Sequence, residues 1–71
     1  MKQDFKNLGV YFQEKRVAKG ISQKEVADRL GYSSAQFVSN WERGVCAPPM
    51  DALPSLLKIY SIPAKEVISK I

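Results

Sequence analysis

The sequence predicts an all-α fold of five helices, and three observations support this prediction. Gly20, Gly31 and Gly44 each follow an apolar-periodic stretch of about 9 to 15 residues, the usual place for a left-handed C-terminal cap. Beyond the last of them, apolar residues recur at i, i+3, i+4 and i+7, the spacing of one helix face. No segment shows the alternating pattern of a strand, and the chain has no internal repeat or low-complexity segment.

Length and composition predict one small domain over residues 1–71. A hydrophobic content of 45% excludes a disordered chain, and no apolar run approaches the roughly 20 residues of a membrane span. The polar residues 1–7 lack the apolar centre of a signal peptide. Cys46 is the only cysteine, so no internal disulfide can form, which favours a reducing compartment. We therefore expect a cytoplasmic protein that does not bind membranes.

The residue inventory gives little support to a metal, a cofactor or a catalytic site. The chain has no histidine and a single thiol, too few soft ligands for a structural zinc ion. No grouping of Ser, Cys and His indicates covalent catalysis, and no glycine-rich loop follows a strand. Cys46 lies in a predicted loop and is interpreted as an inert thiol. We expect no enzyme, no metal and no cofactor.

The first helix is predicted from about Phe5 to Lys19. The residues expected on its inward face are Phe5, Leu8, Phe12 and the stem of Lys15. Three apolar residues do not fit that stripe well, and one of them could serve another face or a partner: Val10, Tyr11 and Val17.

The next two helices are predicted to be short and joined by a tight turn. Ser22 and Glu25 have the spacing of a capping box, which opens a helix over about 23–30 with Val26, Ala27 and Leu30 inward. Gly31 ends that helix, and Ser34 can cap another over about 35–43, with Trp41 and either Phe37 or Val38 inward. Two short helices with a tight glycine-containing turn form a helix-turn-helix, whose second helix can enter a DNA major groove.

The fourth helix is predicted to begin at Pro49, whose missing N–H suits a first turn. Its inward stripe is Met50, Leu53, Leu56, Leu57 and Tyr60. Pro54 removes a backbone hydrogen bond, so we expect a bend or a first turn without regular pairing. After Pro63, a last short helix contains Val67, Ile68 and Ile71.

The outward arc of the helix at 35–43 is polar and small. Its residues are Ala35, Gln36, Ser39, Asn40 and Arg43. Gln and Asn can bond an adenine edge bidentately, Ala can contact a thymine methyl, and the helix start next to Ser34 favours phosphate. An ordinary solvated helix face is the simpler interpretation of such an arc in a small helical protein. Its position directly after another short helix favours the nucleic-acid interpretation.

Two further observations concern residues outside this helix that could bind DNA or hold the helix in place. Gln23, at the start of its helix, can contact a phosphate, although an exposed first-turn Gln would need no function. Arg16 and Glu42 lie where a compact arrangement of three helices would bring them together as a bidentate ion pair. The alternative is two exposed charges worth well under about 1 kcal/mol. Trp41 is interpreted as a core residue. The net charge of +4 favours polyanions, although its basic residues are scattered.

These segments together resemble the XRE family of phage Cro and repressor proteins. The pattern Gly9-x-x-Phe12-x-x-x-Arg16 resembles the family's first helix, and Gly20-Ile21-Ser22-Gln23-x-x-Val26-Ala27 resembles the entry to its second. The run Ser39-Asn40-Trp41-Glu42-Arg43-Gly44 is similar to the end of its third helix, and 48–67 follow its fourth and fifth. The resemblance covers about residues 8–68 and implies a five-helix lambda-repressor-like DNA-binding domain.

The resemblance also implies roles for single residues. Base contacts fall on Ala35, Gln36 and Asn40. Phosphate contacts fall on Gln23, Ser34 and Arg43. A phosphate contact is also expected from Ser39, because this residue lies on the outward arc. The pair that braces the first helix against the third falls on Arg16 and Glu42.

Three departures from the family pattern bear on these roles. The turn before the third helix holds one residue more than the commonest pattern, so its entry angle can differ and Ser33 can add a phosphate contact. Phe37 occupies a position that is often small or polar in the family and could reach a thymine methyl instead of the core. The loop at 45–48 lacks the Lys or Arg that relatives often place against phosphate, which lowers the expected salt dependence.

We therefore expect a stand-alone, sequence-specific regulator of transcription that binds double-stranded DNA as a homodimer. Its recognition helix, 34–43, would enter major grooves about 34 Å apart on a roughly palindromic operator. A Cro-like repressor, a restriction-modification controller and an antitoxin-type autoregulator all fit. Dimer contacts are expected from Ile62, Val67, Ile68 and Ile71, which exceed what one small core needs. No residues remain for an effector-sensing domain, so we expect no small-molecule effector. The alternative function is a protein-interaction module with the same fold.

Overall fold

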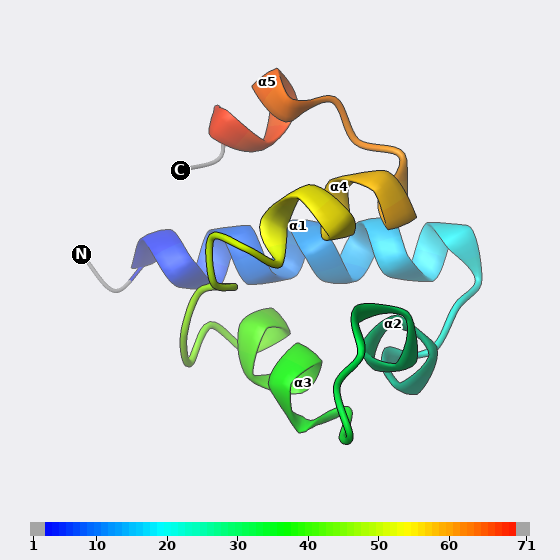
Figure 1. Ribbon diagram of the computed structural model, residues 1–71. Helices are drawn as coiled ribbons and strands as arrows, with labels where there is room; N and C mark the ends of the chain where they lie inside the picture. The colour runs from blue at the N-terminus through cyan, green and yellow to red at the C-terminus, as the bar shows by residue number, and fades with distance from the viewer. Residues whose placement is uncertain (1–2, 70–71) are drawn as a thin grey trace.

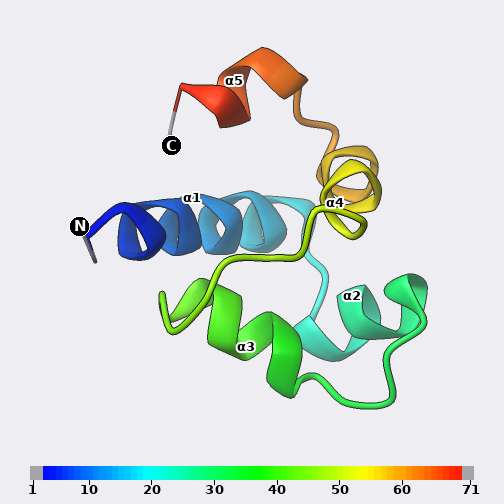
Figure 2. The ribbon, with the colours of Figure 1, turned by 60° about the vertical axis from the view of Figure 1, so that its left-hand side comes forward.

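The computed structural model describes residues 3–69, and these form five α-helices and no strand. The helices are α1 (Gln3–Lys19), α2 (Gln23–Leu30), α3 (Gln36–Glu42), α4 (Leu53–Tyr60) and α5 (Ala64–Ile68). Figure 1 and Figure 2 show α1 running through the middle, with α2 and α3 on one side and α4 and α5 on the other. The prediction of an all-α fold with five helices is confirmed for these residues.

The buried face of α1 consists of Leu8, Tyr11 and Phe12. The sequence predicts Leu8 and Phe12 on this face, but the placement of Tyr11 outside it is wrong. Tyr11 is covered because α5 lies along α1, where the Tyr11 hydroxyl donates a hydrogen bond to Glu66 Oε1 at 2.6 Å. One helix therefore buries two adjacent faces, one against α3 and one toward α5.

The remainder of α1 follows the predicted stripe less closely. The helix begins at Gln3, two residues before the predicted start. Val10 and Val17 are exposed, and Lys15 is half-buried with its Nζ 5.4 Å from the centre of the Tyr11 ring. The side chain of Phe5 lies outside the described part of the chain.

Gly9 lets α1 and α3 approach each other closely. A Cβ atom at this position would lie 2.4 Å from the backbone oxygen of Trp41 and 2.6 Å from that of Glu42. Because both atoms belong to the backbone, no side-chain rotation could relieve the overlap. At the other end of the same contact, Gly44 has a φ of 79°, and a Cβ there would lie 2.7 Å from Lys6 Cα. Two glycines therefore set the distance between α1 and the end of α3.

The bounds of α2 are those that the sequence predicts. Ser22 is its N-cap and accepts a hydrogen bond from the Glu25 N–H at 3.0 Å, as in the first half of a capping box. The Glu25 carboxylate instead accepts a hydrogen bond from Arg29 at 2.6 Å, one turn further along. Gly31 ends the helix with a φ of 85°, a left-handed conformation that glycine adopts without steric cost. The short turn that follows therefore starts at a fixed residue.

The start of α4 differs from the prediction by four residues. The helix begins at Leu53, which puts Pro54 in its first turn, where the missing N–H removes no intrahelical bond. A turn precedes it, in which the Ala52 N–H donates to the Pro49 oxygen at 3.0 Å. The inward placement of Met50 is wrong: it lies in this turn and is 83% exposed, and Ala52 is the buried residue there.

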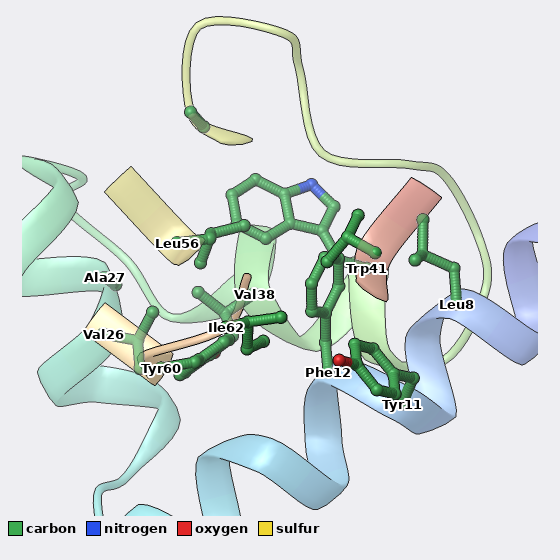
Figure 3. Packing of buried hydrophobic residues seen from close by; sticks show 12 residues of the cluster. Leu8, Tyr11, Phe12, Val26, Ala27, Val38, Trp41, Leu56, Tyr60 and Ile62 are labelled. Atoms are coloured by element: carbon green, nitrogen blue, oxygen red, sulfur yellow. The ribbon is translucent and has the colours of Figure 1, made fainter. Parts of the chain in front are cut away.

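One hydrophobic core joins all five helices. Its buried residues are Leu8, Tyr11, Phe12, Val26, Ala27, Val38, Trp41, Ala52, Leu56, Tyr60, Ile62 and Val67. Figure 3 shows the Trp41 indole and the Phe12 ring inside this cluster. Trp41 is only 4% exposed, so its interpretation as a core residue is confirmed.

The C-terminal segment supplies core residues rather than a free apolar surface. Ile62 and Val67 are buried within the same chain, so the prediction that they exceed the needs of one core is wrong. Both side chains are buried because α5 packs back toward α1 and α4 (Figure 1). Ile68 is 68% exposed, and Ile71 lies outside the described residues.

Candidate nucleic-acid interface

The turn between α2 and α3 leads directly into the candidate interface. The Ser34 Oγ accepts a hydrogen bond from the Gln36 N–H at 3.0 Å. The cap residue of α3 is nevertheless Ala35, one residue later than predicted, because its backbone oxygen accepts the first helical hydrogen bond, from the Ser39 N–H at 3.0 Å. The helix also ends one residue earlier than predicted, with Arg43 as its C-cap. Ser33 and Ser34 are both exposed.

The core side of α3 is formed by Val38 and Trp41, which decides between the two predicted alternatives in favour of Val38. On the outer side, Gln36 and Arg43 are exposed. The remaining residues of the predicted polar arc are partly exposed: Ala35, Ser39 and Asn40. The polar arc therefore faces solvent, and no other segment of residues 3–69 covers it fully.

The polar side chains of α3 bond to one another, which the sequence analysis did not anticipate. Asn40 Oδ1 accepts hydrogen bonds from Gln36 Nε2 at 2.9 Å and from Arg43 Nη2 at 2.6 Å. The Arg43 Nε also donates to Ser39 Oγ at 3.3 Å. Their i, i+3 and i, i+4 spacings are the sequence signal that predicts such contacts on a helix. The polar side chains on the outer face of α3 therefore form one hydrogen-bonded network.

Phe37 lies at the edge of this polar face and is 49% exposed. Its ring centre lies 5.0 Å from that of Tyr32, and Tyr32 in turn meets Trp41 at 5.8 Å in an edge-on arrangement. Aromatic pairs at such distances attract each other beyond their area of burial. The turn residue Tyr32 thus connects the exposed Phe37 ring to the core.

Arg16 and Glu42 form a bidentate ion pair between α1 and α3. Arg16 Nε lies 2.7 Å from Glu42 Oε2, and Arg16 Nη2 lies 3.2 Å from Glu42 Oε1. The third nitrogen, Nη1, donates to the Ile21 backbone oxygen at 2.9 Å. The hydrogen bond to Glu42 raises the pKa of the Arg16 guanidinium, and burial, together with the Glu42 charge, raises the pKa of the nearby Tyr60 phenol. The pair connects the end of α3 to the last turn of α1.

Gln23 is part of the same arrangement. Its Nε2 donates to Glu42 Oε1 at 2.8 Å, so the side chain is held at the start of α2 next to the end of α3. A glutamine amide has a second N–H and a carbonyl oxygen, and both remain available here within the described residues. The sequence predicts that Gln23 contacts phosphate, but it does not predict the hydrogen bond from Gln23 to Glu42.

In a comparison of the sequence with family models, the helix-turn-helix model matches residues 12–67. The chain belongs to the XRE-type helix-turn-helix family. The resemblance found in the sequence is therefore confirmed, as is the assignment of a lambda-repressor-like fold.

Two curated proteins are similar to this helix-turn-helix chain. The HTH-type transcriptional activator BcrR of Enterococcus faecalis is 33% identical over 57 residues, which cover 80% of this chain and 28% of BcrR. The cryptic phage CTXphi transcriptional repressor RstR of Vibrio cholerae is 30% identical over 54 residues, which cover 76% of this chain and 48% of RstR. The chain thus spans less than half the length of either relative. No solved structure matches it.

Other candidate sites are few in the described part of this helix-turn-helix chain. Among residues 3–69, no group of three or more His, Cys, Asp or Glu could hold a metal ion. No helix within those residues has both the length and the apolar character needed to cross a membrane. Cys46 is exposed. The outer face of α3 with its flanking turn is therefore the candidate site that the geometry favours.

Proposed function

We propose that this chain is a sequence-specific DNA-binding regulator of transcription that inserts α3 into the major groove of double-stranded DNA. The observation that carries the proposal is the exposed polar face of α3, centred on Gln36 and Asn40. A groove-binding helix needs polar groups outward and a fixed attachment inward. The Arg16–Glu42 pair and the buried Trp41 supply that attachment.

The proposed base contacts come from the outer side of α3 and its edge: Ala35, Gln36, Phe37 and Asn40. A free glutamine amide can bond the N6 and N7 atoms of adenine, and an exposed phenyl ring can contact a thymine methyl. Phosphate contacts are proposed for Gln23, Ser33, Ser34, Ser39 and Arg43. Phosphate contacts position the protein on DNA, whereas base contacts determine the sequence it prefers.

We further propose that the chain binds as a homodimer to a roughly palindromic operator. Helix-turn-helix dimers contact half-sites about 34 Å apart, one turn of DNA. Of the predicted dimer set, Ile68 of α5 is the apolar residue that is exposed among the described residues. Sedimentation at micromolar concentration tests the dimer, and a monomer on a selected operator would contradict it.

A gel-shift experiment across salt concentrations tests DNA binding itself. We expect the affinity for random duplex DNA to be measurable at low salt and to fall as salt rises, because each basic side chain that neutralises a phosphate releases counterions. Selection of bound sites from a random pool then gives the operator, its symmetry and its half-site spacing. No shift at low salt would contradict the proposal.

Two glutamine variants separate base contacts from phosphate contacts. Gln36→Ala should cost roughly 1–3 kcal/mol at one base position and relax the preference there. Gln23→Ala should weaken binding to every sequence about equally. Gln13→Ala, which removes an exposed glutamine of α1, is the matched control and should change neither. Equal sequence-independent losses from Gln36→Ala and Gln23→Ala would refute the assignment of roles.

A protein-interaction module is the second candidate function, and the exposed Phe37 favours it. A half-exposed phenyl ring beside a polar helix face is also typical of protein interfaces. Under this alternative the chain would give no gel shift at low salt. Under the DNA proposal, Phe37→Ala would weaken binding to sites with thymine and spare sites in which uracil replaces that thymine.

A further inference from the structure

The bonds among the α3 side chains give Gln36 and Asn40 different hydrogen-bonding capacities toward a base. Arg43 determines the direction of these bonds because a guanidinium carries only donors. The Asn40 atom that lies 2.6 Å from Arg43 Nη2 must therefore be the carbonyl oxygen. The Gln36 atom that lies 2.9 Å from that same oxygen must then be its amide nitrogen.

The carbonyl oxygen of Asn40 is therefore saturated. It has two lone pairs, and these accept from Gln36 and from Arg43. Both hydrogens of its Nδ2 stay available within the described residues, so Asn40 can offer donors only. Gln36 uses one N–H and keeps the other together with its carbonyl oxygen, so it can offer one donor and one acceptor.

These capacities match different base edges in the major groove. Adenine presents an acceptor and a donor, which suits Gln36, whereas guanine presents two acceptors and thymine one. We propose that Asn40 selects a base with an acceptor-only edge, guanine or thymine, and that Arg43 is the positioning residue that keeps Asn40 from pairing bidentately with adenine. This inference rests on the proposed function, because it concerns DNA bound by α3.

Selection from a random DNA pool, repeated with variants, tests the inference. The Asn40 position is the one at which every base preference disappears in Asn40→Ala, whereas Gln36→Ala, which also frees one lone pair of the Asn40 oxygen, keeps a preference there and moves it toward adenine. In the wild-type chain we expect guanine or thymine there over adenine by roughly fivefold or more. In Arg43→Ala one lone pair of the Asn40 oxygen is released while Gln36 keeps the other, and the preference at that position should move toward adenine.

Arg29→Ala is the matched control, because it removes the same charge from an exposed arginine of α2 that is paired with Glu25. It should leave the base preferences unchanged. A second measurement needs no DNA: the side-chain amide signals of Asn40 should shift in nuclear magnetic resonance spectra of Arg43→Ala and not in those of Arg29→Ala.

The outcomes separate the inference from the proposed function. Adenine preferred at the Asn40 position by the wild-type chain, an unchanged preference in Arg43→Ala, or unshifted Asn40 amide signals would each overturn the inference alone. Failure of the wild-type chain to enrich any DNA sequence would overturn the proposed function and this inference with it.

Discussion

Removal of Arg16 should destabilise the whole domain, because it leaves a buried negative charge behind. The Glu42 side chain is 3% exposed and that of Arg16 is 13% exposed. Arg16 makes two of the hydrogen bonds to this carboxylate, and Gln23 makes the third. In Arg16→Ala, only the neutral Gln23 amide would remain. Breaking a buried pair by removing one partner typically costs about 3–5 kcal/mol.

That cost is large compared with the total stability of so small a chain. At about 0.05–0.15 kcal/mol per residue, 71 residues give roughly 4–11 kcal/mol in all. Each kcal/mol shifts the melting temperature of a domain of this size by about 4–8 °C. We therefore expect Arg16→Ala to melt at least about 12 °C below the wild-type chain, or to be unfolded at room temperature.

Thermal melting followed by circular dichroism and by Trp41 fluorescence measures the effect. Arg29→Ala is the control: its pair with Glu25 is about half exposed and worth under about 1 kcal/mol. The double variant Arg16→Met with Glu42→Leu removes both charges and should regain most of the lost stability. An Arg16→Ala chain that melts within about 4 °C of wild type, or a double variant no more stable than Arg16→Ala, would show that Arg16 does not offset a buried charge on Glu42.

Three further variants test the packing of α1 and α4. Gly9→Ala should cost about 2 kcal/mol in chemical denaturation, because its Cβ would overlap the Trp41 backbone oxygen; a gain in stability, usual for Gly→Ala in an open helix, would contradict this contact. Burial first, then the hydrogen bond to Glu66, raises the pKa of Tyr11 to about 12. The neutral Tyr11 phenol contributes its full stabilisation below pH 10, the pKa of an unfolded tyrosine, and this contribution is lost as pH rises toward 12. Between pH 10 and 12 the free energy of unfolding should therefore decline less steeply in Tyr11→Phe than in the wild-type chain. Equal slopes in the two chains would contradict this role of Tyr11. Ser61 ends α4 with a φ of 57°, so Ser61→Gly should raise the melting temperature by about 2–4 °C, and an unchanged or lower value would show that this conformation carries no strain.

Several features of the fold could be predicted from the sequence because their causes are local. The bounds of α2 follow from the Ser22 hydroxyl, which caps its start, and from the left-handed Gly31, which ends it. Both residues lie directly next to the helix. The outward placement of Gln36 follows from the 3.6-residue period once Trp41 is assigned to the core. The contact of Arg16 with Glu42 is predicted from the compact packing of three helices and also from the resemblance to a known family.

Other features depend on which helix packs over which part of α1, and the periodicity of a single helix gives no information about such packing. The sequence marks Tyr11 as misplaced and Ile62 and Val67 as surplus, yet all three become buried once α5 folds back over α1. The side-chain bond from Gln23 to Glu42 likewise joins residues 19 positions apart, on two different helices.

The positions of most helices and the polar face of α3 can be predicted from the chain alone, because capping, glycine conformation and helical period act over a few residues. The exposed apolar residues and the orientation of the polar groups of α3 follow instead from the packing of the helices. Burial depends on contacts between distant segments, and the direction of a hydrogen bond depends on the donor that reaches each oxygen. For Asn40, that donor is Arg43.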